Sequence, residues 1–165
     1  MTSRPPLRTL TSGEFKSVDP ARHLISHENA RRYAAIDLGG TAGSYVLSWR
    51  SDLVEPVIDL SPAGERLWVA VDQQVACVEL GSGEVQVRLP LFGNALDIDF
   101  AGDCTAVLTE SEVLLFNDTL SLRALAHLPD LPESMCVSGN NLAIQFADSP
   151  ALTLDVASGR LQRSG

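Results

Sequence analysis

Short apolar runs separated by tight polar turns recur along this chain with a period of 38 residues. A fixed period of that length is typical of proteins built by stacking similar structural units. The matching positions of three successive units are Val75 and Val78, then Val113 and Phe116, then Ala151 and Leu154. The pattern predicts that Val78, Phe116 and Leu154 occupy equivalent buried positions on strands.

From Tyr33 onward the apolar and polar positions follow the pattern of short β-strands. Apolar runs of a few residues are bounded by Gly, Pro, Asn and Asp, and this region shows no helical periodicity. The clearest expected strands cover residues 33–37, 44–49, 56–60, 67–71, 95–100 and 106–109. The sequence therefore predicts an all-β domain over residues 33–165.

The segment before this domain, residues 1–32, is expected to be an N-terminal arm. Pro5-Pro6 and sparse apolar positions predict an extended conformation over residues 1–18. Asp19-Pro20 is typical of a helix start, and a short helix from there to Arg31 is one interpretation of the sequence. The arm is also a candidate edge strand for the last unit, in which no outer strand is evident.

The order of strands and turns within each unit resembles a β-propeller blade of the WD-repeat type. Residues 97–107 contain an apparent inner strand that ends at Phe100, then a turn, then the next strand, and residues 57–69 and 135–144 look like the same element. The resemblance covers residues 57–162, with residues 33–55 as a diverged fourth unit, and the Trp-Asp signature of WD repeats is absent. It implies a propeller-like array of about four short antiparallel blades.

A short array of this kind must cover its two ends. Each blade buries its faces only against its neighbours, so an open array leaves apolar surface in water. Three solutions are expected from the sequence: the chain closes alone, a second copy closes it as a homo-oligomer, or another protein does so.

Charge is distributed unevenly along the 165 residues, which carry a net charge of −9. Residues 1–50 have a net charge of +3, whereas residues 51–165 hold five arginines against 17 carboxylates, a net −12. An acidic body repels nucleic acid and anionic membranes, so neither is an expected partner, and it attracts a basic protein surface. The chain has no membrane-spanning apolar run and its first residues lack a secretory signal, which predicts a cytoplasmic location.

One glycine-rich stretch suggests chemistry. Residues 33–47 resemble the first phosphate-binding hairpin of the actin-like sugar kinase superfamily. The resemblance implies that Asp37 would position a metal-bound water and that Gly39, Gly40 and Thr41 would approach nucleotide phosphates. The long helices and second phosphate loop of that superfamily are missing, and a simple hairpin turn between two strands is the preferred explanation.

Other chemistry-bearing residues form no catalytic or metal-binding pattern. His23 and His27 would share a face of the expected helix, but no third ligand accompanies them. His127 has no evident partner, and Asp97 and Asp99 are expected on one strand face. Cysteines 77, 104 and 136 are expected as buried thiols, and the core aromatics are expected to be Trp49, Trp68, Phe92, Phe100, Phe116 and Phe146.

The sequence thus predicts a non-catalytic protein-interaction module or assembly subunit, with no cofactor and no metal. Two alternatives remain open. One is an acidic immunity-type protein that neutralises a basic partner. The other is a small nucleotide-binding protein that uses the Asp37–Thr41 turn.

Overall fold

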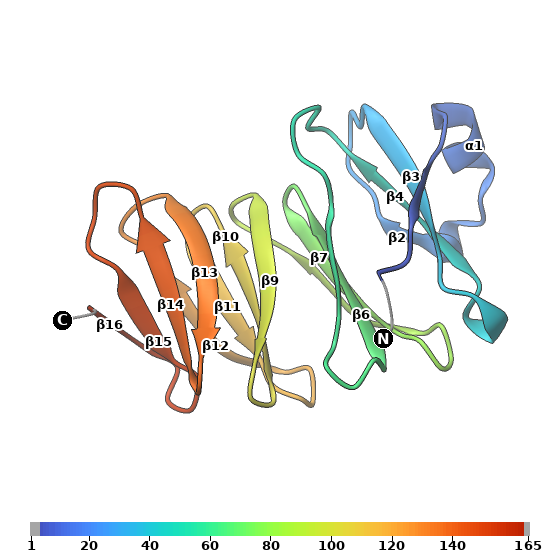
Figure 1. Cartoon of the computed structure of the whole chain (residues 1–165). Helices are drawn as coiled ribbons and strands as arrows, with labels where there is room; N and C mark the ends of the chain where they lie inside the picture. Colours follow the sequence, from blue (N-terminus) through green and yellow to red (C-terminus); the bar gives the residue numbers. More distant parts are fainter. Residues whose placement is uncertain (1–3, 164–165) are drawn as a thin grey trace. The chain divides into compact units, whose positions relative to one another are not determined.

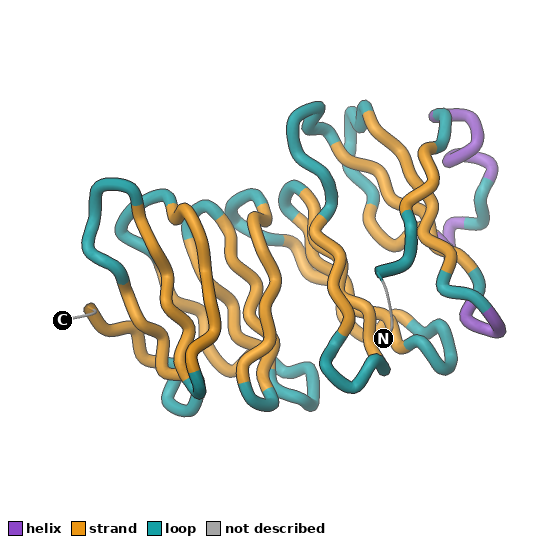
Figure 2. Tube along the Cα trace, in the orientation of Figure 1, coloured by secondary structure: helices purple, strands orange, loops and turns teal. Residues whose placement is uncertain are grey.

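The computed structural model describes residues 4–163, which form a protein built almost entirely of β-sheet (Figures 1 and 2). Strands account for 53% of the residues and helices for 8%, so the predicted all-β class is confirmed. The strands form four sheets of four strands each. The chain divides into two compact units, Met1–Pro90 and Leu91–Gly165, and each unit contains two sheets.

In unit 1, one sheet has a crossed strand order and the other follows the chain. The first sheet, in the order β1-β3-β4-β2, contains β1 (Leu7–Thr9), β2 (His23–Ile25), β3 (Arg32–Asp37) and β4 (Ser44–Trp49). The second sheet contains β5 (Val57–Leu60), β6 (Arg66–Val71), β7 (Gln74–Glu79) and β8 (Val85–Pro90) in that order. All neighbours are antiparallel except β2 and β4, which are parallel.

Both sheets of unit 2 follow the chain order and are antiparallel throughout. The third sheet contains β9 (Ala95–Ala101), β10 (Cys104–Thr109), β11 (Glu112–Phe116) and β12 (Leu122–His127). The fourth contains β13 (Pro132–Ser138), β14 (Asn141–Phe146), β15 (Leu152–Asp155) and β16 (Arg160–Arg163). The fourth sheet therefore has its own outer strand, β16, which was not evident from the sequence.

The 38-residue period corresponds to equivalent strands in the last three sheets. Val78, Phe116 and Leu154 all lie on the third strand of their sheet, and all are buried. Their partners on the second strands are Leu67, Thr105 and Leu142, respectively. The prediction that these three positions are equivalent is confirmed.

The N-terminal segment differs from the expected arm, because it forms part of the first sheet. β1 pairs with β3 at one edge and β2 pairs with β4 at the other. Between them, helix α1 (Ser12–Ser17) crosses the sheet, and its Phe15 forms a buried cluster with Leu10, Ala35 and Val46. The described part of the arm therefore completes and covers the first sheet rather than the last.

The short helix considered from Asp19 to Arg31 does not form. The Asp19 carboxylate does accept a hydrogen bond from the Ala21 amide and Pro20 does begin a helix, but this is the short 3₁₀ turn η1 (Pro20–Arg22). β2 follows at once, because Leu24 and Ile25 become buried in the core of unit 1 as strand residues. α1 begins earlier, at a capping box between Thr11 and Glu14.

The outer face of the fourth sheet is polar. On β14, Leu142, Ile144 and Phe146 belong to the core cluster of unit 2, whereas Asn141 and Gln145 are exposed on the opposite face. A polar outer face is what a terminal unit of a stacked array requires in water. Among the described residues, no helix has the length and apolarity needed to cross a membrane.

Candidate functional site

An exposed phenylalanine projects from the connection that leads into β9. Phe92 is 87% exposed, although the preceding Leu91 is buried. The backbone of Gly93 packs against the β10–β11 turn so closely that a Cβ there would lie 2.9 Å from the Ser111 hydroxyl oxygen. The backbone of the connection is therefore packed against the β10–β11 turn, whereas the Phe92 side chain is exposed to solvent. The expectation that Phe92 is a core aromatic is therefore wrong.

The β10–β11 turn ties this connection to the next one along the chain. The Glu110 amide donates to the Asn94 carbonyl (3.0 Å), and the Leu128 amide donates to the Ser111 carbonyl (2.9 Å). The fully buried Thr109 hydroxyl accepts a hydrogen bond from the Ser111 amide (3.2 Å). The β10–β11 turn is therefore hydrogen-bonded both to the connection before β9 and to the connection after β12.

A second exposed apolar side chain lies on the connection that leads into β13. Leu131 is 59% exposed, although the following Pro132 is buried. The carboxylate of Asp130 accepts from the Leu131 amide (2.8 Å) and from the Ser149 hydroxyl (3.0 Å). Because Ser149 lies in the β14–β15 connection, the second of these hydrogen bonds links two neighbouring loops, whereas the first lies within the connection that carries Leu131.

These connections lie at the same end of unit 2 (Figure 1), and we call them the loop face. The loop face consists of residues 91–94, 109–111, 128–131 and 147–150. Its exposed charged residues are all acidic, and its four segments contain no lysine or arginine; the carboxylates are Glu110, Asp130 and Asp148. The loop face therefore combines two apolar side chains with negative charge.

Unit 1 has a corresponding connection between its two sheets, and it displays Leu53, which is 97% exposed. The Ser51 hydroxyl accepts from the amides of Leu53 and Val54, both at 3.2 Å. The Trp49 indole donates to the Val54 carbonyl at 3.1 Å. The loop that carries Leu53 is thus held by hydrogen bonds on both sides of it.

The three most exposed large apolar side chains of the described chain share one topological position. Each lies in a connection from one sheet to the next: Leu53, Phe92 and Leu131. Isolated exposed apolar residues are ordinary on protein surfaces. In this chain all three lie at the same kind of position, a connection between one sheet and the next.

The glycine-rich turn that resembles a phosphate-binding hairpin joins β3 to β4. One Asp37 carboxylate oxygen accepts from the Gly39 amide (2.9 Å), as in an Asx-type turn, and Gly40 begins the 3₁₀ turn η2 (Gly40–Ala42). The Thr41 hydroxyl donates to the Gly81 carbonyl (3.4 Å) in the β7–β8 turn. The four residues of the suggested nucleotide turn therefore lie together, and both Asp37 and Thr41 have hydrogen-bond partners in the protein.

The two N-terminal histidines do not share a helix face. His23 begins β2, its Nε2 lies 3.0 Å from the Val18 carbonyl, and its ring packs on Phe15 with centroids 4.3 Å apart. His27 places Nδ1 2.7 Å from the Ser48 carbonyl, so Nδ1 carries the proton, and its Nε2 is buried without a hydrogen-bond partner. No cluster of three or more potential metal ligands occurs among the described residues.

The remaining candidates have local structural partners. Asp97 and Asp99 each accept from the following backbone amide, at 2.9 and 2.8 Å. His127 is exposed, with Nδ1 3.9 Å from the buried carboxylate of Glu112.

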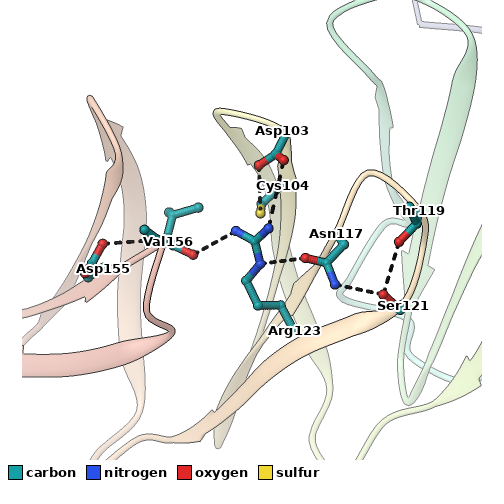
Figure 3. A network of polar contacts seen from close by, with 9 residues as sticks. Asp103, Cys104, Asn117, Thr119, Ser121, Arg123, Asp155 and Val156 are labelled. Carbon is teal, nitrogen blue, oxygen red and sulfur yellow. Dashed lines mark hydrogen bonds and ion pairs between the residues drawn. The ribbon is translucent and has the colours of Figure 1, made fainter.

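Figure 3 shows a polar network of unit 2 that centres on Arg123 of β12. Its guanidinium donates to the Asn117 side chain (2.5 Å) and to the Val156 carbonyl (3.1 Å), and it lies 3.9 Å from the Asp103 carboxylate. The Cys104 thiol donates to Asp103 (3.3 Å). This network joins the third and fourth sheets and leaves Arg123 committed to contacts within the protein.

The cysteines differ in exposure. Cys77 and Cys104 are buried, as expected, but Cys136 is exposed on β13. Burial raises the pKa of the Cys77 thiol to about 12. Burial also raises the pKa of the Cys104 thiol, and its hydrogen bond to Asp103 acts in the same direction. The two buried thiols are therefore protonated and unreactive at neutral pH.

Comparison with solved structures gives matches to propeller-like proteins at low sequence identity. The computationally designed protein Ika4 has a TM-score of 0.58 and 11% identity, over 70% of this chain and 74% of Ika4. The N-terminal domain of Nup159, a β-propeller, has a TM-score of 0.53 and 12% identity over 87% of this chain. A structure of S. cerevisiae Dbp5 bound to Nup159 and Gle1 matches with a TM-score of 0.52 and 12% identity, over 86% of this chain.

These similarities define the fold alone. This chain spans 42% of the Nup159 domain and 42% of the matching chain in the Dbp5 structure. No protein-family model and no curated protein sequence matches the chain. The protein is thus an all-β, propeller-like protein of four four-stranded sheets.

Proposed function

We propose that this chain is a protein-interaction module and that it binds its partner through the loop face of unit 2. The observation that carries the proposal is the display of Phe92 and Leu131, 87% and 59% exposed, from connections fixed by hydrogen bonds. Aromatic and leucine side chains on a surface lose unfavourable contact with water when a partner covers them. Aromatic residues are also enriched among the side chains that dominate binding energy at protein interfaces.

The rigidity of the loop face supports a role in binding. Gly93 packs on the Ser111 side chain, and the Asp130 carboxylate bridges the Leu131 amide and the Ser149 hydroxyl. A backbone already held in one conformation loses little entropy when a partner binds. A propeller-like scaffold is compatible with this role, and the similar Nup159 occurs in a complex with Dbp5.

Site-specific photo-crosslinking in the native cell tests the proposal. A benzophenone side chain is introduced in place of Phe92, of Leu131, and, as the control, of Leu122. Leu122 is 46% exposed but pairs with Phe116 at the opposite end of β12 from His127. We expect the same crosslinked protein from positions 92 and 131 and none from position 122. Equal products from all three positions, or none from the loop face, would reject the proposal.

The Phe92→Ser variant provides an independent readout. Because the side chain is almost fully exposed, the substitution should leave the thermal unfolding temperature unchanged. Copurification of the crosslinked protein should fall at least tenfold, since an anchor side chain is lost. Leu122→Ser, which removes an exposed apolar side chain elsewhere in unit 2, should leave copurification unchanged.

A further inference from the structure

The carboxylates of the loop face are fixed close to its apolar side chains. Glu110 accepts a hydrogen bond from the Asn94 amide (3.3 Å), two residues after Phe92. Asp130 immediately precedes Leu131 and accepts from its amide. Each exposed apolar side chain therefore has a carboxylate held nearby by a backbone hydrogen bond.

No positive charge of the loop face offsets these carboxylates. Unit 2 contains ten carboxylates and three arginines, and none of the arginines lies in the four loop-face segments. Arg123 is committed to Asn117, Asp103 and the Val156 carbonyl (Figure 3). A negative surface with uncompensated charge attracts positive groups and repels negative ones.

We propose that the loop face recognises a basic, partly apolar segment of a partner protein. Lysine or arginine side chains of that segment pair with Glu110 and Asp130, while its apolar side chains cover Phe92 and Leu131. The inference rests on the proposed function and adds the chemistry of the partner. A second copy of this chain is a poor occupant because its own loop face and its net charge of −9 are negative.

The inference is tested with defined peptides and the chain of 165 residues. The probe is a short synthetic peptide of alternating lysine and leucine, compared with a glutamate–leucine and a lysine–serine peptide of the same length. We expect the lysine–leucine peptide to bind at least tenfold more tightly than either of the others. We also expect its affinity to fall when the salt rises from about 0.05 M to about 0.5 M, because screening weakens exposed charge pairs.

Two matched variants connect this binding to the loop face. The double variant Glu110→Gln/Asp130→Asn keeps hydrogen-bond acceptors but removes both charges, and it should weaken peptide binding about tenfold and reduce the salt dependence. Asp118→Asn removes an exposed charge from the β11–β12 turn. It should change neither the affinity for the peptide nor the salt dependence of binding. Thermal unfolding of both variants verifies that they are folded. Equal binding of all three peptides, or unchanged binding by the double variant, would overturn the inference.

Different experimental results would reject the basic partner and the proposed interaction role. If position 92 crosslinks to a partner whose binding is unaffected by the double variant and by salt, the basic partner is rejected and the interaction role stands. If the lysine–leucine peptide binds as expected but positions 92 and 131 capture no cellular protein, the interaction role fails. The charge preference then stands as a property of the surface alone.

Discussion

A Cβ atom placed on Gly83 would lie 2.6 Å from the carbonyl oxygen of Ala42. The two residues belong to turns of different sheets in unit 1, and this short distance means that the backbones of the two turns are in direct contact. The Tyr45 hydroxyl donates to the Gly83 carbonyl, and the Thr41 hydroxyl donates to the Gly81 carbonyl beside it. The glycine-rich turn therefore has a structural explanation: it joins the first sheet to the second.

Gly83→Ala should destabilise the protein by about 2–4 kcal/mol, because it adds a steric clash to an unfavourable backbone conformation. Gly139→Ala is the control, since Gly139 also has a positive φ, 60°, but has no atom within 4 Å of the added Cβ. The control should lose only about 1 kcal/mol. Urea unfolding measures both variants, and equal losses would show that the two turns do not pack as described.

Phe116→Ala should destabilise by about 3–5 kcal/mol, the usual effect of removing a buried aromatic side chain. Phe116 is 3% exposed, whereas Phe92 is 87% exposed. Phe92→Ala removes the same atoms from a solvent-exposed site and should change the free energy of unfolding by less than about 0.5 kcal/mol. Chemical denaturation of the Phe116→Ala and Phe92→Ala variants measures both changes in the free energy of unfolding. A loss below about 1 kcal/mol for Phe116→Ala would contradict the repeat alignment.

The capping box of α1 should make stability depend on pH. Hydrogen bonds from the backbone and side chain of Thr11 lower the pKa of Glu14 below its usual value of 4.5. A carboxyl whose pKa is lower in the folded state stabilises that state above its unfolded pKa and loses this effect as the pH falls through its folded pKa. Unfolding measured from neutral to acidic pH should therefore show a smaller acid-induced loss in Glu14→Gln than in the parent chain. An identical pH profile would show that the box does not form.

Thr11→Ala tests the same cap at neutral pH. The Thr11 hydroxyl accepts from the Glu14 amide at 3.1 Å, and removing an N-cap of this kind costs about 1 kcal/mol. Thr11→Ser retains the hydroxyl and should lose much less. Thermal unfolding of the two variants separates the cap from any effect of side-chain size, and equal losses would argue against the hydrogen bond.

Thiol labelling should distinguish the three cysteines. Cys136 is exposed and should react quickly with a disulfide reagent in the folded protein. Cys77, with a pKa of about 12, and the buried Cys104 should react only after unfolding in denaturant. The Cys136→Ser variant should therefore show almost no fast labelling. Rapid reaction of more than one thiol in the parent chain would contradict the assigned burial.

Deletion of residues 1–18 should cause self-association. The deletion removes β1 and α1, which exposes the edge of β3 together with the apolar side chains of Ala35 and Val46. Deletion of residues 1–5 is the control, because it leaves β1 and α1 in place. Light scattering should detect larger particles only for the longer deletion. A monomer of unchanged stability would mean that the segment does not cover the first sheet.

The hydrophobic pattern of the sequence determined the strands and their repeat. The burial of Val78, Phe116 and Leu154 follows from short apolar runs that recur with a 38-residue period along the sequence. Local turn chemistry was likewise predictable, as the cap formed by Asp19 and Pro20 shows. Such features depend on residues that are close in the chain, so a single sequence reveals them.

Only the tertiary structure decided the partners of the N-terminal segment and the exposure of Phe92. Leu24 lies in a strand because β4 pairs with it and because Arg88 of β8 donates to its carbonyl at 3.2 Å. Phe92 has the apolar side chain that is typical of a core residue, yet it is exposed to solvent on a connection whose next residue, Gly93, packs on Ser111. Hydrophobicity identifies which residues favour burial, but the contacts that bury or expose each one join segments far apart in the chain, and these form only when the chain folds.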